Sequence, residues 1–259
     1  MRIGFIGLGN MGAPMAHNLA KAGHTVFGFD TQNVSVQMIE LLPTARDCAE
    51  KADVVITMLP NGKILKSVAK QTIKHMKEGT IFLDCSTVDV PSAKRVAEIS
   101  NKHKIISLDA PVSGGIGGAK EGTLTFMVGG AEEGFIKAKE LFDVMGQKAV
   151  HCGGSGNGQS AKICNNMILG ATMIATCEAF ALADKLGLER QAMFDVVSTS
   201  SGYSWSMNAY CPAPGIGPKA PSDNNYIPGF SSDLMLKDLT LSQIAAEDVN
   251  ADTPMGELA

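Results

Sequence analysis

The 259-residue sequence is poor in aromatic side chains, in net charge and in closely spaced cysteines. Aromatic residues make up 5% of the chain, and the formal net charge is −4 without a run of basic residues. Because nucleic-acid binding depends on basic patches and on aromatic stacking, we expect no nucleic-acid partner. The six cysteines form no C-x-x-C pair and no Cys/His ligand spacing, so we expect buried, reduced thiols and no metal site.

Long apolar runs are scarce as well. No stretch approaches the length and purity of a transmembrane helix, so we expect no membrane partner. Met1 leads directly into an apolar run, and we therefore expect no signal or transit peptide in this sequence. The 45% apolar and 19% charged residues are typical of a globular protein, and the length suits one large domain or two modest ones.

The clearest nucleotide-binding signal lies near the N-terminus. An apolar run over residues 2–6 ends in the G-x-G-x-x-G sequence Gly7-Leu8-Gly9-Asn10-Met11-Gly12. An amphipathic segment follows and closes at Gly23, and a second apolar run over residues 25–29 ends at Asp30. This order of strand, glycine loop, helix, strand and acid is typical of a dinucleotide site, although a glycine-rich turn without a ligand is the alternative.

Each residue of that pattern has a physical task. Gly7 permits the tight turn, Gly9 lets a pyrophosphate approach the backbone, and Gly12 lets the helix pack on the strand. Asp30 is placed to accept hydrogen bonds from ribose hydroxyls, and no arginine follows it to hold a 2′-phosphate. The predicted cofactor is therefore NAD.

Alternation of strands and helices continues through the first half of the chain. We predict strands at residues 53–59, 80–84, 105–109, 123–129 and 147–151, and helices near residues 61–76, 91–103 and 131–145. Such a pattern predicts an α/β fold with a doubly wound sheet, a Rossmann domain over residues 1–155. Ligands bind beyond the carboxyl ends of these strands, where Leu59, Pro60, Ser86 and Thr87 lie. Pro60 is equally well explained as a turn residue.

The segment from Asp109 to Gly118 holds four glycines beside Ser113. Backbone amides and a hydroxyl in a flexible loop can form a carboxylate cradle, whereas the competing interpretation is a mobile linker.

From Gly156 onward the pattern becomes helical, which predicts an all-α second domain over residues 156–259. One helix runs to about Leu186 and places Lys162 and Asn166 on one face, one turn apart. A lysine on this apolar stripe is costly unless it is used, and both burial and the helix dipole would lower its pKa. We also predict helices at residues 189–200 and 233–247, an irregular proline-rich stretch at 203–229, and a solvated surface charge at Lys237.

Four blocks together resemble the 3-hydroxyacid (β-hydroxyacid) dehydrogenase family, and the resemblance covers essentially the whole chain. They are the segment from Phe5 to Leu19, Asp84-Cys85-Ser86-Thr87, Asp109-Ala110-Pro111-Val112-Ser113-Gly114-Gly115, and Gly156 to Asn166 with Lys162 and Asn165-Asn166. Two further segments, residues 209–226 and Lys237-Asp238, resemble the branch that oxidises 3-hydroxyisobutyrate to methylmalonate semialdehyde with NAD in valine breakdown.

The resemblance implies roles for particular residues. Lys162 would be the catalytic acid/base, and Asn166 would orient the substrate beside it. Thr87 would lie between nicotinamide and substrate, and Lys237 would reach the cofactor, which replaces the surface-charge interpretation. The implied carboxylate-binding residues are Ser113, Gly114 and Gly115, and the implied cofactor-binding residues are Gly7, Gly9, Asn10, Met11, Gly12, Asp30, Leu59, Pro60, Thr87 and Lys237.

Two alternatives stay open. A sister enzyme would reduce tartronate semialdehyde, glyoxylate or succinic semialdehyde, although Asp30 disfavours its NADPH-using members. A non-catalytic NAD-binding scaffold is the second alternative, and the presence of Lys162 counts against it.

The resemblance also implies a small 3-hydroxy acid substrate and a homo-oligomer, dimer or tetramer, in the full-length form. It implies a mitochondrial matrix location in animals and a cytoplasmic one in bacteria. Two departures from the family stand out. The segment Leu41–Ala49 is short, so we expect the third strand to be missing or distorted. Family members continue through further helices beyond the position of Ala259, so we expect the second domain to lack C-terminal helices.

Overall fold

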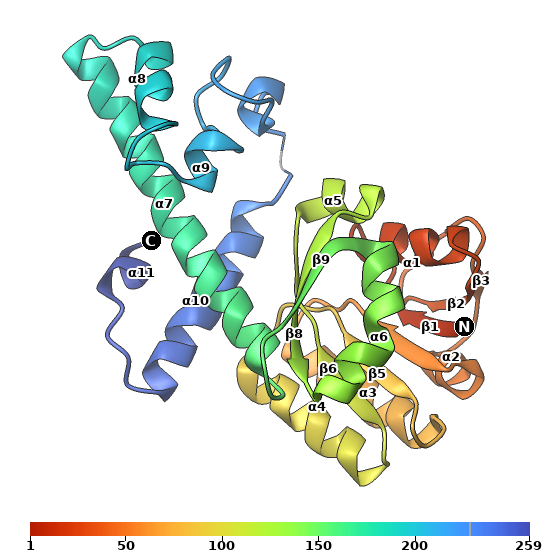
Figure 1. Cartoon of the computed structure of the whole chain (residues 1–259). Helices are drawn as coiled ribbons and strands as arrows, with labels where there is room; N and C mark the ends of the chain where they lie inside the picture. Colours follow the sequence, from red (N-terminus) through yellow and green to blue (C-terminus); the bar gives the residue numbers. More distant parts are fainter. Residues whose placement is uncertain (228) are drawn as a thin grey trace. The chain divides into compact units, whose positions relative to one another are not determined.

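The computed structural model describes residues 1–227 and 229–259. The chain divides into two compact units, Met1–Lys162 and Ile163–Ala259 (Figure 1). The first unit is α/β and the second is helical, as the sequence predicts, and the predicted fold class is confirmed. The boundary between the units falls inside one long helix, α7 (Asn157–Leu186), directly after Lys162.

The first unit is organised around a sheet of nine strands among the described residues, in the order β3-β2-β1-β4-β5-β6-β8-β7, with β9 beside β8. Strands β1 to β6 pair in parallel, β8 runs antiparallel to β6 and β7, and β9 is parallel to β8. The strands are β1 (Arg2–Ile6), β2 (Thr25–Phe29), β3 (Glu40–Leu41), β4 (Val54–Thr57), β5 (Ile81–Asp84), β6 (Ile106–Asp109), β7 (Val112–Ser113), β8 (Leu124–Gly130) and β9 (Gly146–His151).

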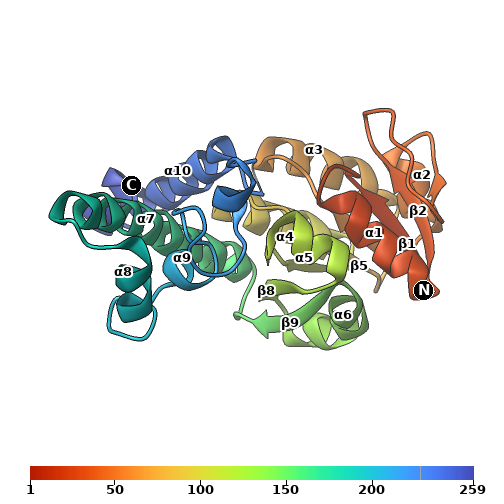
Figure 2. The same cartoon turned by 90° about the horizontal axis from the view of Figure 1, so that it is seen from above.

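Helices cover both faces of this sheet (Figures 1 and 2). One apolar cluster joins the sheet to α1 and α6, and a second joins it to α2, α3 and α4. Every residue of β4 and β5 is buried, because a parallel sheet with helices on both faces leaves no strand face to water. The helices of this unit are α1 (Gly12–Lys21), α2 (Ala45–Lys51), α3 (Gly62–Thr72), α4 (Val90–Lys102), α5 (Gly115–Glu121) and α6 (Glu132–Met145), with a short 3-10 turn η1 (Ile73–His75).

The second unit packs shorter helices around an apolar cluster beside α7. This cluster contains Phe180 and Ala183 from α7 together with Met193, Met207, Cys211, Ala213 and Ile216. Its elements are α8 (Arg190–Val197), α9 (Trp205–Asn208), the 3-10 turn η2 (Pro221–Asn224), α10 (Ser232–Asp248) and α11 (Pro254–Leu258). The stretch predicted to be irregular therefore contains two short helical elements, and Pro228 lies outside the described residues.

Two local predictions need correction. The third strand is present, but it is only the two-residue β3, which pairs with Phe27 and Gly28 of β2. The glycine-rich segment 109–118 is not a loop throughout, because Gly115 begins the helix α5 and Ser113 belongs to β7. Its glycines misled the prediction, since glycine lowers helix propensity without forbidding a helix.

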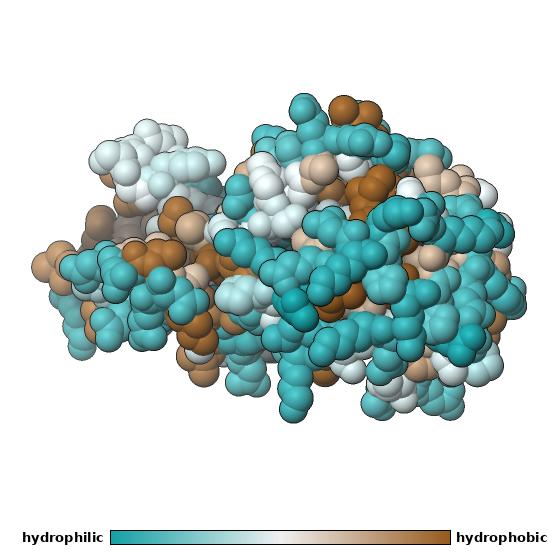
Figure 3. All heavy atoms as spheres, turned by 90° about the horizontal axis from the view of Figure 1, so that it is seen from below, coloured by the Kyte–Doolittle hydropathy of each residue, from teal (hydrophilic) through white to brown (hydrophobic). Residues whose placement is uncertain are grey.

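A third correction concerns α7. By length and composition this helix could cross a membrane, with a mean hydropathy of 1.4 in its most apolar 18-residue window, so the statement that no stretch approaches a transmembrane helix is wrong. Mostly buried core helices of soluble proteins pass the same test, but only 28% of this window of α7 is buried, and the helix also carries the buried polar residues Lys162, Asn166 and Thr176. On the face drawn in Figure 3, hydrophilic residues cover most of the surface and hydrophobic ones gather in smaller groups.

The cysteine prediction holds only in part. Cys48, Cys85 and Cys211 are buried, and Cys152 is half-buried, whereas Cys164 and Cys177 are exposed on α7. Burial raises the pKa of the Cys48 thiol to about 12, which leaves it protonated and unreactive at neutral pH.

The core of the first unit allows a stability prediction. Phe142 is fully buried on α6, and its ring centroid lies 5.0 Å from that of Phe126 and 5.9 Å from that of Phe135. We expect Phe142→Ala to lower the free energy of unfolding by about 3–5 kcal/mol, because it removes a large ring and leaves a cavity. Urea unfolding measures this change. Ile136→Ala, on the same helix but 64% exposed, is the control and should have an effect within about 0.5 kcal/mol.

Candidate active site

The parallel register brings the carboxyl ends of five strands to one edge of the sheet. Neighbouring strands pair Phe29 with Ile6, Ile6 with Thr57, Thr57 with Asp84, and Asp84 with Asp109. The predicted site residues of the first unit that follow these strands, from the glycine loop to Thr87, therefore lie along this edge. This is the position at which open α/β sheets bind their ligands.

The glycine loop joins β1 to α1, and its three glycines have different reasons to be glycine. A Cβ atom on Gly7 would collide with the carbonyl oxygen of Met58, and one on Gly12 would collide with the carbonyl oxygen of Gly7. Gly7 also has a φ of +95°, which favours glycine. Packing thus explains Gly7 and Gly12.

Gly9 is different, because a Cβ atom there would meet no heavy atom within 4 Å. Nothing in the protein itself requires a glycine at this exposed position, whereas a ligand that approaches the backbone would. The start of α1 also suits an anion: Met11 provides no side-chain cap, and the first turn contains no acidic residue. The residues present therefore fit the pyrophosphate of a dinucleotide.

Asp30 follows β2 and is anchored by backbone amides. Its Oδ2 accepts a hydrogen bond from the Leu8 amide at 2.6 Å, and its Oδ1 accepts one from the Gln32 amide at 2.8 Å. Each carboxylate oxygen can accept a second bond, so ribose hydroxyls still find acceptors there. The contact with Leu8 also ties the acid to the glycine loop.

Strands β5 and β6 each end in an acid, Asp84 and Asp109. The sequence does not single these two acids out as site residues. Asp84 is 2% exposed, and its Oδ1 accepts hydrogen bonds from the hydroxyls of Thr57 and Ser86, each at 2.6 Å, and from the Ser86 amide at 3.2 Å. Its Oδ2 has no hydrogen-bond partner in the described part of the chain. Burial, with Asp109 as a further cause, raises the pKa of Asp84 to about 7.

Ser86 connects Asp84 to the segment that follows β4. Its hydroxyl accepts a hydrogen bond from the Leu59 amide at 2.8 Å while it donates to Asp84. Leu59 after β4 is thus joined to the residue that precedes Thr87 through one buried network. The sequence signal that could have revealed it is an acid that ends a fully apolar parallel strand, a position where burial makes a carboxylate expensive.

Asp109 holds the start of α7. Its Oδ1 accepts a hydrogen bond from the Gly156 amide at 2.7 Å, and its Oδ2 accepts one from the Gln159 amide at 3.0 Å. Burial raises the pKa of Asp109, and these amides act in the opposite direction. Lys162 follows three residues after Gln159 and is 7% exposed.

The remaining predicted residues occupy separate places. Ser113, on β7, and Gly114 and Gly115, at the start of α5, are half-buried or exposed, with φ angles of +130° at Gly114 and +61° at Gly115. Asn166 and Lys237 belong to the second unit.

Within that unit, the structure adds a residue to the prediction. The Asn166 amide donates a hydrogen bond to Asp238 Oδ2 at 2.6 Å, and Lys237 Nζ lies 3.1 Å from Asp238 Oδ1, within ion-pair distance but outside hydrogen-bond geometry. Asp238 is 3% exposed and so links the two predicted residues on α7 and α10.

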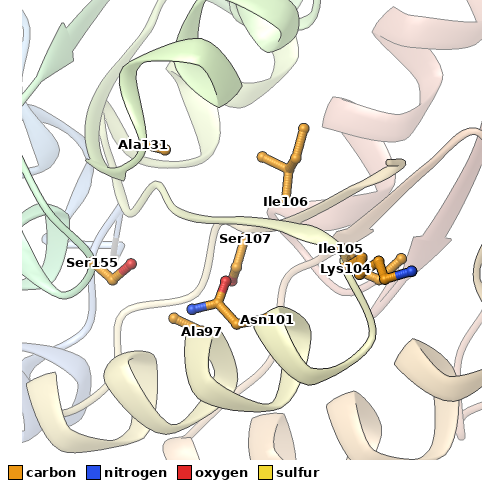
Figure 4. A pocket seen from close by; sticks show the side chains of 8 residues that line it. All are labelled: Ala97, Asn101, Lys104, Ile105, Ile106, Ser107, Ala131 and Ser155. Atoms are coloured by element: carbon orange, nitrogen blue, oxygen red, sulfur yellow. The ribbon is translucent and has the colours of Figure 1, made fainter. Parts of the chain in front are cut away.

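A surface cavity of about 330 Å³ lies elsewhere on the first unit. Figure 4 shows Asn101 and Ser107 pointing toward one another in it, with the Lys104 side chain directed away. Ser107 is near the start of β6, whereas the candidate site lies at the other end of that strand. None of the predicted site residues lines this cavity.

Two family models match nearly the whole chain. Residues 2–154 match the family described as the NAD binding domain of 6-phosphogluconate dehydrogenase, and residues 156–259 match the family described as NAD-binding of NADP-dependent 3-hydroxyisobutyrate dehydrogenase. A 3-hydroxyisobutyrate dehydrogenase of Pseudomonas aeruginosa is 46% identical over 99% of this chain and 89% of its own length. An NAD-dependent L-serine dehydrogenase of the same organism is 43% identical over 100% of this chain and 89% of its own.

A solved structure also has a similar sequence and fold. The Mycobacterium tuberculosis 3-hydroxyisobutyrate dehydrogenase with L-serine superimposes with a TM-score of 0.95 at 43% identity, over 99% of this chain and 90% of that one. Fold, site and relatives define the class as NAD-dependent oxidoreductases that act on hydroxy acids. Within that class, the chain belongs to the 3-hydroxyisobutyrate dehydrogenase family.

The glycine loop yields a paired prediction. We expect Gly9→Ala to keep the wild-type melting temperature but to raise the Kd for NAD by about tenfold or more, because the added methyl group occupies the side from which a ligand approaches. Gly12→Ala should instead destabilise the protein by about 1–3 kcal/mol through its clash with Gly7. Calorimetric NAD titration and thermal unfolding separate the two effects. Unchanged NAD affinity in Gly9→Ala would contradict the assignment of this loop.

The buried acid Asp84 yields a pH prediction. Its folded pKa of about 7 lies above the ordinary value of 3.8, so between these values the folded protein keeps a proton that the unfolded chain releases. This contribution therefore destabilises the fold as pH rises from about 4 to about 7, by at most about 1.4 kcal/mol per pH unit. In Asp84→Asn the decline should become shallower, which urea unfolding across this range measures. Parallel profiles for the two proteins would show that Asp84 does not titrate in this window.

Proposed function

We propose that the chain oxidises 3-hydroxyisobutyrate to methylmalonate semialdehyde with NAD, the reaction used in valine breakdown. The observation that carries the proposal is a buried lysine, Lys162, on a helix whose first turn is bonded to the strand ends that also position the cofactor loop. The name of the Pseudomonas aeruginosa relative at 46% identity supports the particular substrate.

The cofactor is held by residues already described. Gly9, Asn10 and Met11 offer their backbone to the pyrophosphate, and Asp30 accepts from the adenosine ribose. Leu59, Pro60 and Thr87 are proposed to lie on its nicotinamide side. When bound, NAD accepts a hydride from the carbon that bears the substrate hydroxyl.

The protein handles the proton and the carboxylate. Lys162, as a neutral amine, removes the hydroxyl proton, and its ammonium form stabilises the negative charge that develops on oxygen. Ser113, Gly114 and Gly115 are proposed to bind the substrate carboxylate through a hydroxyl and backbone amides. Asn166 and Lys237 keep the roles that the family resemblance implies, and Asp238 orients both through its two contacts.

L-serine is the second candidate substrate, because one relative is named for it and one similar structure contains it. Both molecules are 3-hydroxy carboxylates that differ at carbon 2, where serine has an ammonium group and 3-hydroxyisobutyrate a methyl group. The same acid/base and carboxylate residues would serve either one. Discrimination therefore depends on the surroundings of carbon 2.

The test compares kcat/KM for 3-hydroxyisobutyrate and L-serine by NADH absorbance, with NAD and NADP in parallel. We expect turnover with NAD and a preference for 3-hydroxyisobutyrate. A preference for L-serine would favour the second candidate, and reduction of tartronate semialdehyde, glyoxylate or succinic semialdehyde with NADPH alone would favour a sister enzyme. NAD binding without turnover of any of these compounds would favour a scaffold.

Removal of the lysine tests the mechanism. We expect Lys162→Ala to lower kcat by about 10²–10⁴-fold, because general acid/base catalysis contributes that much, while the Kd for NAD stays nearly unchanged. Lys185→Ala, in the last turn of the same helix and exposed, is the control and should keep wild-type kcat. Equal losses of turnover and NAD affinity in Lys162→Ala would indicate a structural lysine.

The proposal extends to assembly and location. We propose a homo-oligomer, measurable by light scattering, and a mitochondrial or bacterial cytoplasmic location according to the source of the chain.

A further inference from the structure

The long helix α7 begins without a cap of its own. The residue before it is Gly156, which has a φ of +91° and no side chain to accept a hydrogen bond from the first turn. The side chain of Asn157, the first helical residue, donates instead to the carbonyl oxygen of Cys152 at 2.9 Å. A helix start that is buried needs acceptors for its first amides, so they must come from another part of the chain.

Asp109 supplies these acceptors from the end of β6. Its two carboxylate oxygens accept from the amides of Gly156 and Gln159, the position before the helix and the third position within it. A capping side chain normally serves this third amide from the residue that precedes the helix. Here the cap comes from 47 and 50 positions away in the sequence, and its carboxyl group lies at the positive end of the helix dipole, which favours the ionised form of an acid.

Two glycines lie against this carboxylate, where a side chain would collide with it or with nearby backbone. A Cβ atom on Gly129 would lie 2.6 Å from Asp109 Oδ1, and one on Gly158 would lie 2.8 Å from Asp109 Oδ2. Gly129 of β8 therefore leaves space for the carboxylate, and Gly158 in the first turn of α7 leaves space both for it and for the carbonyl oxygens of Asp109 and Met127, with which such a Cβ would collide.

A second contact fixes the same turn to β5. The fully buried side chain of Gln159 accepts a hydrogen bond from the Val88 amide at 3.0 Å and donates one to the Ser86 carbonyl at 2.8 Å. These two residues flank Thr87, which is proposed to contact the nicotinamide and the substrate. Gln159 and Asp109 thus hold the first turn of α7 against two neighbouring strand ends.

We propose that Asp109 is a positioning residue that sets the placement of Lys162 for proton transfer, with Gln159 as its second anchor. Lys162 lies three residues after Gln159 on a continuous helix, so its backbone position follows from that of the first turn. The inference rests on the proposed function of Lys162 as the acid/base. Catalysis is sensitive to such placement, since a displacement of about 1 Å can cost about 10²-fold in rate.

Asp109→Asn is the direct test. The asparagine can accept from only one of the two amides, and its NH2 group faces the other, so the first turn should loosen. We expect kcat to fall by about 10–10²-fold with little change in the Kd for NAD, and the pH dependence of kcat to shift. Amide hydrogen exchange should accelerate within residues 156–162 and remain unchanged in β1 and α1. Asp143→Asn, the same substitution at an exposed site on α6, is the control and should match wild type.

A second variant and a double-mutant cycle complete the test. Gln159→Met keeps the side-chain size but removes both of its hydrogen bonds, so we expect it to lower kcat in the same way. This variant keeps the proposal testable if Asp109→Asn fails to fold. When Lys162 is already alanine, Asp109→Asn should lower kcat little further, because the two residues act as one unit.

Three results would overturn the proposal. The first is wild-type kcat and wild-type hydrogen exchange in Asp109→Asn. The second is an equal loss of kcat and NAD affinity in this variant, with faster exchange throughout the first unit. The third is a double variant in which the effects of Asp109→Asn and Lys162→Ala on kcat are fully additive. Failure of the proposed function looks different, because wild-type protein would then turn over neither substrate or Lys162→Ala would remain active. The hydrogen-exchange comparison decides on the Asp109 contacts in either case.

Discussion

The alignment of parallel strand ends is the constraint on which the site depends. Pairing in register places Phe29, Ile6, Thr57, Asp84 and Asp109 side by side at the ends of five strands. Chain segments that leave these ends must diverge within a few residues, and each does so with a glycine, a proline or a hydroxyl residue. The glycine loop, the turn around Thr87 and the start of α7 consequently lie along one edge of the sheet, although more than 150 residues separate Gly7 from Lys162.

Two buried carboxylates turn this alignment into a rigid site. Asp84 and Asp109 are direct neighbours on β5 and β6, and two full negative charges at that distance in a buried place would be expensive. Their surroundings divide the roles. Burial raises the pKa of both acids, but backbone amides at both oxygens of Asp109 oppose the rise, whereas Asp84 accepts hydrogen bonds at one oxygen only and its pKa rises to about 7.

Much of the fold could be predicted from the sequence because its local signals agree with its tertiary structure. The apolar runs at residues 2–6 and 25–29 correspond to β1 and β2 residue for residue, and the glycines between them and the acid directly after the second run mark the dinucleotide pattern. Helix α7 was predictable from its length and from the glycine at its start. In each case a short stretch of chain carries the whole signal.

The prediction failed where the signal was not local. Residues 115–118 form part of α5 although three of them are glycine, and Gly118 lies against the side chain of Leu124, a contact with a distant part of the sequence. The apolar character of α7 is a property of a long window, and the polar residues Lys162 and Asn166 near the start of the helix interrupt it locally. Asp109, Gln159 and Asp238 act through contacts with residues 47 to 73 positions away, which spacing in one sequence does not reveal.

The central claim is that one edge of the sheet serves both the cofactor and the catalytic lysine. A crystal structure of the protein grown with NAD tests it most directly. The account predicts the pyrophosphate against the backbone of Gly9 to Met11, the adenosine ribose hydroxyls on Asp30, and the contacts of Asp109 with Gly156 and Gln159 unchanged. Density for NAD elsewhere, or a bound cofactor with no contact to Asp30 and a displaced start of α7, would contradict it.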